Sequence, residues 1–157
     1  MFDEWSHYSY ETPLGTLTIQ DDGIGIARVH WDVEEKDKKG ENQETELIKR
    51  AFNQLMEYFG GSRKTFDLPL RLRGTAFQKK VWQVLRQIPY GETWTYQQVA
   101  DAIGNSNASR AVGMANNRNP VAIIVPCHRV IGSNGRLTGY AGGIELKKQL
   151  LQMESVV

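Results

Sequence analysis

The sequence predicts an α/β protein with two parts: a small N-terminal α/β module of hairpin sheet plus helix, and a mainly helical C-terminal domain containing a helix-turn-helix. Residues 1–70 show short strand patterns before one helical segment, whereas helical apolar spacing dominates residues 71–157. Charge divides at the same place, with 8 Lys and Arg against 14 Asp and Glu in the first part and 11 against 4 in the second. The basic half either faces a polyanion or attracts the acidic half.

The N-terminal module is expected to begin with three antiparallel strands, at residues 7–12, 15–20 and 25–31. The Asp21-Asp22-Gly23 turn joins the last two strands, and a charged, solvated loop follows at residues 34–41. Apolar residues then recur at helical spacing over residues 45–59, until Gly60-Gly61 ends the helix. The first 70 residues therefore form a supporting domain in this reading.

The C-terminal domain begins after a linker at residues 61–74. Helical spacing predicts helices at residues 77–88, 95–103 and 144–154, with another reaching residue 115 that Ser106 or Asn107 caps. The apolar run at residues 121–125 predicts a buried strand. Two short helices around Gly104 have the outline of a helix-turn-helix, although many helical hairpins bind nothing.

Gly113 lies in the middle of one of these helices, where glycine costs roughly 1 kcal/mol relative to alanine. Either the close approach of a partner to the backbone or tight packing against another helix would explain it. The sequence alone leaves both explanations open.

Cys127 is the only cysteine, in Pro126-Cys127-His128-Arg129-Val130. One cysteine forms no internal disulfide, the N-terminus resembles no signal peptide, and no apolar run could span a membrane. We therefore expect a cytoplasmic protein with no membrane partner.

The same pentapeptide offers a nucleophile beside its base, because cationic neighbours favour the thiolate. The alternative is that Cys127 is a small buried apolar residue. On an extended strand Cys127 and His128 would point to opposite faces, so the chain must turn at Pro126 or a water must bridge the two groups. Glu154 offers a carboxylate that could orient the histidine, and the glycine-rich residues 132–143 could wall a flat pocket.

Several motifs follow one another between about Gly74 and Glu154. They are Phe77-Gln78, Val81-Trp82, Ile88-Pro89, Gly91, Thr95-Tyr96-Gln97-Gln98-Val99-Ala100, Ile103-Gly104, Ala108-Ser109-Arg110-Ala111-Val112-Gly113, Asn119-Pro120, Ile124-Val125-Pro126-Cys127-His128-Arg129-Val130, Leu137-Thr138-Gly139-Tyr140-Ala141-Gly142-Gly143, Lys147, Leu150-Leu151 and Glu154. In these motifs the sequence resembles the O6-alkylguanine-DNA alkyltransferases, or methylated-DNA–protein-cysteine methyltransferases, of bacterial type. Residues 10–15 and the hairpin-plus-helix outline are similar to the family only loosely.

The resemblance implies a DNA repair protein that binds the minor groove, flips O6-alkylguanine out of the duplex and transfers the alkyl group irreversibly to a cysteine, once per molecule. O4-alkylthymine is a second candidate lesion. The catalytic residues carried over are Cys127 as acceptor, His128 as its base through a water, Glu154 as the group orienting the histidine, Tyr96 as proton donor to guanine N3, and Asn119 as holder of the turn before the active-site strand.

The DNA-binding residues carried over are Arg110, which would fill the vacated stack, and Tyr96, Ala108, Ser109, Ala111, Gly113 and Met114. The pocket residues are Thr138, Tyr140, Ala141 and Val130; the carbonyls of Cys127 and Val130 and the amide of Ala141 would read the guanine edge. Met114, Asn117 and Arg118 stand where small residues or glycine are commoner in the family.

The resemblance implies no cofactor, and one copy suffices for the chemistry, so a monomer is expected. Some relatives hold zinc in the N-terminal domain, but residues 1–70 contain no cysteine and only His7 and His30, so we expect no metal here. Two other functions stay open: a protein that recognises alkyl lesions without repairing them, and a cysteine hydrolase, which would need an oxyanion hole and turnover.

Overall fold

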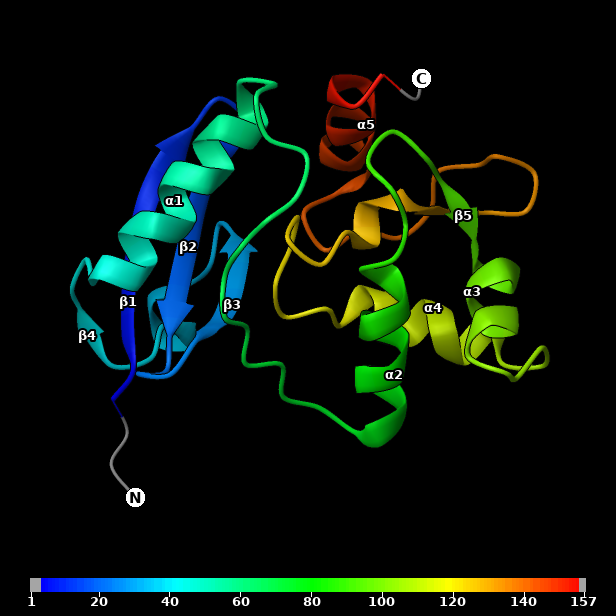
Figure 1. The fold of residues 1–157 in the computed structure, drawn as a ribbon, viewed down its shortest axis with the longest axis horizontal. Helices are drawn as coiled ribbons and strands as arrows, with labels where there is room; N and C mark the ends of the chain where they lie inside the picture. Colours follow the sequence, from blue (N-terminus) through cyan, green and yellow to red (C-terminus); the bar gives the residue numbers. More distant parts are fainter. Residues whose placement is uncertain (1–3, 156–157) are drawn as a thin grey trace. The chain divides into compact units, whose positions relative to one another are not determined.

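The computed structural model describes residues 4–155, and the chain divides into two compact units between Arg73 and Gly74. The predicted α/β class, with an N-terminal sheet and a helical C-terminal domain, is confirmed (Figure 1). Within the described part of the chain, no helix combines the length and the apolar character needed to cross a membrane.

The first unit is a four-stranded sheet with one long helix on it. The strand order is β3-β2-β1-β4, antiparallel except for the β1–β4 pair. The elements are β1 (Ser6–Thr12), β2 (Gly15–Asp21), β3 (Ile26–Trp31), β4 (Glu41–Asn42) and α1 (Glu46–Phe59). β4, and a short 3₁₀ turn at Glu35–Asp37, lie where the sequence predicted only a charged loop. A two-residue edge strand has too little apolar pattern to be read from sequence.

The core of this unit lies between α1 and one face of the sheet, and α1 runs along β1 and β2 in Figure 1. Thr45 caps the helix by accepting a hydrogen bond from the amide of Ile48. Tyr10 of β1 stacks on Phe52 of α1 with ring centroids 3.7 Å apart. The fully buried apolar side chains are Leu17, Ile19, Ile26, Ile48, Ala51 and Leu55.

The two histidines of this unit make one hydrogen bond to a loop and one between two strands of the sheet. The ring of His7 donates from Nδ1 to the carbonyl of Lys39 at 2.9 Å, and His30 accepts from the amide of Gln20 at 2.8 Å. Burial lowers the pKa of His30 to about 4, so its ring is neutral at pH 7. Among residues 4–155 no cluster of side chains could hold a metal ion.

Residues 69–71, near the end of the expected linker, are hydrogen-bonded to β3 of the first unit. The amide of Ile26 donates to the carbonyl of Pro69, and the amide of Arg71 donates back to Ile26, both at 2.8 Å. Asp22 reinforces this edge, because its carboxylate accepts the amides of the following turn and pairs with Arg71 at 3.0 Å and Arg73 at 2.7 Å. Residues 69–71 are therefore an added edge of the sheet.

Asp22→Asn should destabilise the protein at neutral pH. Its side chain is only 1% exposed; that burial opposes ionisation, but two amides and two guanidiniums outweigh it and lower the pKa from 3.8 to about 2. The stabilisation is therefore complete above pH 3.8 and is lost as the pH falls through about 2. We expect the variant to lose about 2 kcal/mol of unfolding free energy at pH 7 in urea titrations. An equal loss at pH 2 and pH 7 would contradict this assignment.

The second unit packs four helices around the segment that carries the cysteine. Its elements are α2 (Ala76–Leu85), β5 (Trp94–Thr95), α3 (Tyr96–Ala102), α4 (Ser109–Asn117), a 3₁₀ turn at Cys127–Arg129, β6 (Val130–Ile131) and α5 (Ile144–Met153). Capping boxes at Thr75 and Thr95 start α2 and α3. The indole of Trp82 on α2 donates to the carbonyl of Ala115 at 2.9 Å, a buried bond that joins α2 to α4.

Two details of this unit correct the sequence prediction. Neither Ser106 nor Asn107 caps α4, which begins at Ser109 after Ala108 with no side-chain cap. Instead the amide of Ala108 closes a turn on Asn105, and Gln97 of α3 donates to the carbonyl of Ser106. Ser106 and Asn107 therefore belong to the turn between α3 and α4, and neither side chain caps α4.

Residues 121–125 are buried as expected, but they form a tight turn and not a strand. Ile123 has a φ of +72°, a left-handed conformation that costs a β-branched residue energy. Asn119 holds it in place: its side chain accepts from the amide of Val121 at 3.0 Å and donates to the carbonyl of Val125 at 2.7 Å. The apolar run signalled burial correctly, but the asparagine before it decides the backbone path.

Candidate active site

The cysteine lies on a turn that aims its side chain into the second unit. Pro126, with φ −82° and ψ 64°, leads into a single 3₁₀ turn over Cys127–Arg129. The amide of Cys127 bonds Val125, and that of Arg129 bonds Pro126. The chain therefore turns at Pro126, so the opposite-face arrangement of a strand does not arise, and Cys127 is only 6% exposed.

Behind the cysteine lies a buried chain of three charged or ionisable groups. His128 Nε2 donates to Glu154 at 2.8 Å, and the Arg129 guanidinium binds the same carboxylate through Nε at 2.9 Å and Nη2 at 3.0 Å. Arg129 also donates to the carbonyl of Ile88, and the amide of Gly91 reaches Glu154. These donors hold the buried Glu154 carboxylate in one orientation.

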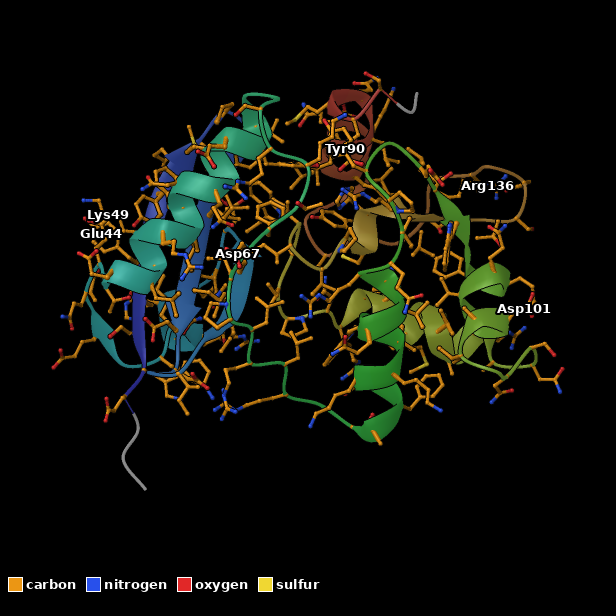
Figure 2. The ribbon with its side chains drawn as sticks, in the orientation of Figure 1. Glu44, Lys49, Asp67, Tyr90, Asp101 and Arg136 are labelled. Carbon is orange, nitrogen blue, oxygen red and sulfur yellow. The ribbon has the colours of Figure 1, made fainter. Side chains whose placement is uncertain are left out.

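Arg129 also lies close to one aromatic ring. Its guanidinium lies 5.7 Å from the centre of Tyr90, which stands beside α5 and is labelled in Figure 2. From the sequence, Arg129 was expected to be a cation beside the thiol. In the structure its guanidinium is instead committed to Glu154 and a main-chain carbonyl, because the 3₁₀ turn directs it away along the buried chain.

The protonation states suit a thiol that gives up its proton only during reaction. Burial raises the pKa of Cys127, opposed by the Asn119 side chain and the charge of Lys147. Burial lowers the pKa of His128, opposed by Glu154. The ring is therefore neutral with its proton on Nε2, and Nδ1 is buried without a partner among the described residues. An unpaired basic nitrogen is what a general base requires.

Lys147 is the cation that sequence reasoning left without a role. It is fully buried on α5 and its ammonium donates to the carbonyls of Val130 at 2.5 Å and Thr138 at 2.6 Å. Burial lowers its pKa to about 8. The sequence placed Lys147 only within a helix at residues 144–154, so the fold alone reveals that its side chain faces inward.

A second layer of amides supports the cysteine. Asn116, the last buried residue of α4, donates to the carbonyl of Cys127 at 3.3 Å, and the amide of Val130 binds the same oxygen. Asn117 lies against Gly139, where an added Cβ would come within 2.9 Å of its side-chain oxygen. The end of α4 therefore contacts both the cysteine turn and the loop of residues 132–143.

A hollow of about 400 Å³ opens on the face formed by α3 and α4. Its lining residues are Tyr96, Gln97, Ser109, Arg110, Gly113 and Ser133. Arg110 and Ala111 are exposed, Ala108 is half-buried, and Met114 is 63% exposed on α4. Most residues predicted to bind DNA thus share one helix, and the hollow itself collects Tyr96, Ser109, Arg110 and Gly113.

The expected pocket residues lie around the loop that follows β6. β5 and β6 pair in parallel with Trp94 opposite Val130, which places Tyr96 beside the strand that leaves the cysteine turn. Thr138 and Tyr140 are half-buried and Ala141 is exposed. The amide of Gly143 closes this loop on Tyr140. Cys127, His128 and Glu154 lie deeper and do not line the hollow.

Comparison with known proteins assigns both units. The family described as "6-O-methylguanine DNA methyltransferase, ribonuclease-like domain" matches residues 7–72, and its DNA binding domain matches residues 76–156. The methylated-DNA–protein-cysteine methyltransferase of Methanosarcina acetivorans is 51% identical over 150 residues, covering 92% of this chain and 95% of that protein. The constitutive protein of that name in Bacillus subtilis is 50% identical over 153 residues, 93% of each chain.

The solved structures agree with these relatives. The crystal structure of Mycobacterium tuberculosis OGT in complex with DNA has a TM-score of 0.88 and 45% identity, covering 95% of this chain and 92% of that one. A crystal structure of the O6-methylguanine methyltransferase of the same organism gives the same TM-score at 44% identity. The similarity therefore extends over nearly the whole chain.

Proposed function

Because this chain belongs to the 6-O-methylguanine DNA methyltransferase family, we propose that it repairs duplex DNA by moving the alkyl group of O6-alkylguanine irreversibly to Cys127, in a single turnover. The observation that carries the proposal is the buried chain from His128 to Glu154 beside the only cysteine. It supplies a base for the thiol without exposing the thiol to competing reactions in solvent.

In this proposal His128 Nδ1 takes the thiol proton through a bridging water. Glu154 holds Nε2–H and stabilises the imidazolium that forms. The thiolate sulfur attacks the alkyl carbon, the bond from that carbon to O6 breaks, and its electron pair returns to the purine. Tyr96 donates a proton to guanine N3, so that a neutral base leaves. The alkyl group stays on sulfur as a thioether, which is why the protein acts once.

We place DNA on the face of α3 and α4, where the hollow and the exposed Arg110 lie. Arg110 fills the space left by the flipped nucleotide, and the small residues Ala108, Ser109 and Ala111 let α4 approach the minor groove. The basic balance of residues 71–157 supports contacts to phosphates without sequence preference. One copy of the chain contains every group used, so we propose that it acts as a monomer, in the cytoplasm.

The Gly113→Ala variant should show whether the glycine is required for packing within the unit or for DNA binding. An added Cβ would lie 3.7 Å from the Tyr96 ring, an ordinary contact, so packing within the unit does not demand glycine. Urea unfolding should show a variant at least as stable as the wild type, by up to about 1 kcal/mol, because alanine favours helix. Its affinity for a lesion-containing duplex should fall about tenfold, or ~1.4 kcal/mol, because the methyl group projects into the hollow.

Two outcomes would contradict this prediction for Gly113. A less stable variant would mean that the fold itself requires the glycine. Unchanged affinity, measured by fluorescence anisotropy at fixed salt, would remove Gly113 from the DNA-binding residues.

The test of the proposed function is the intact mass of the protein after incubation with a duplex containing one O6-methylguanine. The expected result is a gain of one methyl group per molecule, mapped to Cys127 by peptide analysis, with no further gain on adding substrate. A protein that binds this duplex tightly without any mass change would be a lesion-recognition protein. Repeated turnover of a model ester would instead favour a cysteine hydrolase.

A further inference from the structure

Two hydroxyl groups meet at the edge of the hollow on α3 and α4. The hydroxyl of Tyr96, the first residue of α3, lies 2.9 Å from the side-chain oxygen of Thr138. Thr95 fixes the backbone of Tyr96 by capping α3, and Gly113 leaves the face of the ring uncovered. The ring is thus positioned by its own helix, whereas the direction of its O–H bond depends on Thr138.

Thr138 is itself fixed from the buried side. Its main-chain carbonyl accepts the Lys147 ammonium at 2.6 Å, and the same ammonium donates to Val130 at 2.5 Å. Val130 pairs with Trp94, two residues before Tyr96. These contacts form a closed set that runs from Tyr96 through Thr138, Lys147 and Val130 back to β5. They hold the hydroxyl oxygen of Thr138 at a defined position, unlike that of a threonine on a free loop.

We propose that Thr138 is a positioning residue for the proton transfer, donating its hydroxyl hydrogen to the Tyr96 oxygen so that the phenol proton points to the leaving guanine. The inference rests on the proposed function. A hydroxyl rotates freely, and either oxygen can be the donor of this hydrogen bond. Once guanine N3 offers an acceptor, the phenol hydrogen turns to it and the threonine hydrogen takes the remaining lone pair.

The proton balance explains the effect on rate. When Tyr96 gives its proton to N3, its oxygen becomes a phenolate, and the hydrogen bond from Thr138 strengthens as that charge develops. The proton taken from the thiol by His128 later returns through solvent to Tyr96. The thiol proton therefore ends, in net terms, on guanine. An interaction that is stronger in the transition state than before it accelerates the chemical step.

The experiment compares Thr138→Val, Thr138→Ser, Tyr96→Phe and the combination of Thr138→Val with Tyr96→Phe. Valine keeps the size and branching of threonine, and the Lys147 bond survives because it uses the main-chain carbonyl. Single-turnover transfer from an O6-methylguanine duplex should be about 10- to 100-fold slower with valine, or ~1.4–2.7 kcal/mol, and serine should restore most of it. In the Tyr96→Phe background, adding Thr138→Val should cause no further loss.

A second substrate separates positioning from a structural role. In O6-methyl-3-deazaguanine a C–H group replaces N3, so Tyr96 has no acceptor for its proton. Wild type and Thr138→Val should react with this base at equal rates, although both react slowly. A structural defect would slow Thr138→Val with both substrates.

Three results would overturn the inference alone while the wild type still takes up the methyl group. They are a Thr138→Val variant as fast as the wild type on O6-methylguanine, losses that add in the Tyr96→Phe background, and an equal slowing on the 3-deaza base. A wild type that takes up no methyl group overturns the proposed function, and this inference with it.

Discussion

Cys127→Ala will take up no alkyl group, yet it will bind the lesion-containing duplex within about threefold of the wild type, a difference under 1 kcal/mol. Transfer needs a sulfur on the first residue of the turn that follows Pro126, and no other residue of the chain is a cysteine. The residues proposed to contact DNA lie on α3 and α4, outside that turn. Removing one small, 6% exposed side chain should therefore leave that face unchanged.

The measurement pairs intact mass with fluorescence anisotropy on the same duplex. Cys127→Ser is the matched control, because it keeps the size and a hydroxyl while replacing the soft sulfur by a much weaker nucleophile. We expect serine also to fail in transfer. Uptake of a methyl group by Cys127→Ala would show that another side chain is the acceptor, and loss of DNA binding in both variants would show that the turn shapes the DNA-binding face.

Glu154→Gln will have the largest effect on stability. The carboxylate of Glu154, a residue that is 3% exposed, pairs with Arg129 and His128. Glutamine has the same shape but no charge, so the Arg129 guanidinium is left buried without its counter-ion. Breaking one partner of a buried ion pair costs about 3–5 kcal/mol, and we expect a loss of that size in urea unfolding.

The same substitution will slow transfer, because His128 loses the group that fixes its tautomer and stabilises the imidazolium. We expect the single-turnover rate to fall by about 10²- to 10⁴-fold, measured below the temperature at which the variant unfolds. Glu92→Gln is the control: an exposed carboxylate of the same unit whose removal should change neither quantity. A stable Glu154→Gln variant that reacts at the wild-type rate would show that the buried chain is structural.

The helices and the long strands were largely predictable because their cause is local. Period-two and helical patterns of apolar residues lie within single segments, and the burial of one face follows from them. β4, β5 and β6 were not predictable, since each has two residues and exists only through its partner strand. The tight turn at residues 121–125 was misread as a strand because β-branched residues favour strands, while the bonds made by Asn119 impose another path.

The sequence by itself determined the chemistry this chain carries: a single cysteine followed by histidine, a late glutamate, and one arginine on a helix of small residues. Order and spacing identify these groups, because a nucleophile and its base must be particular residue types. Only the tertiary structure decided how the charges are shared, since residues distant in sequence set the environment of each group. Arg129 pairs with Glu154 and not with the cysteine sulfur, and Lys147 faces inward and donates to two carbonyls. The hydroxyl of Thr138 forms a hydrogen bond with that of Tyr96. Burial then sets the pKa of each group, and burial is a property of the folded chain.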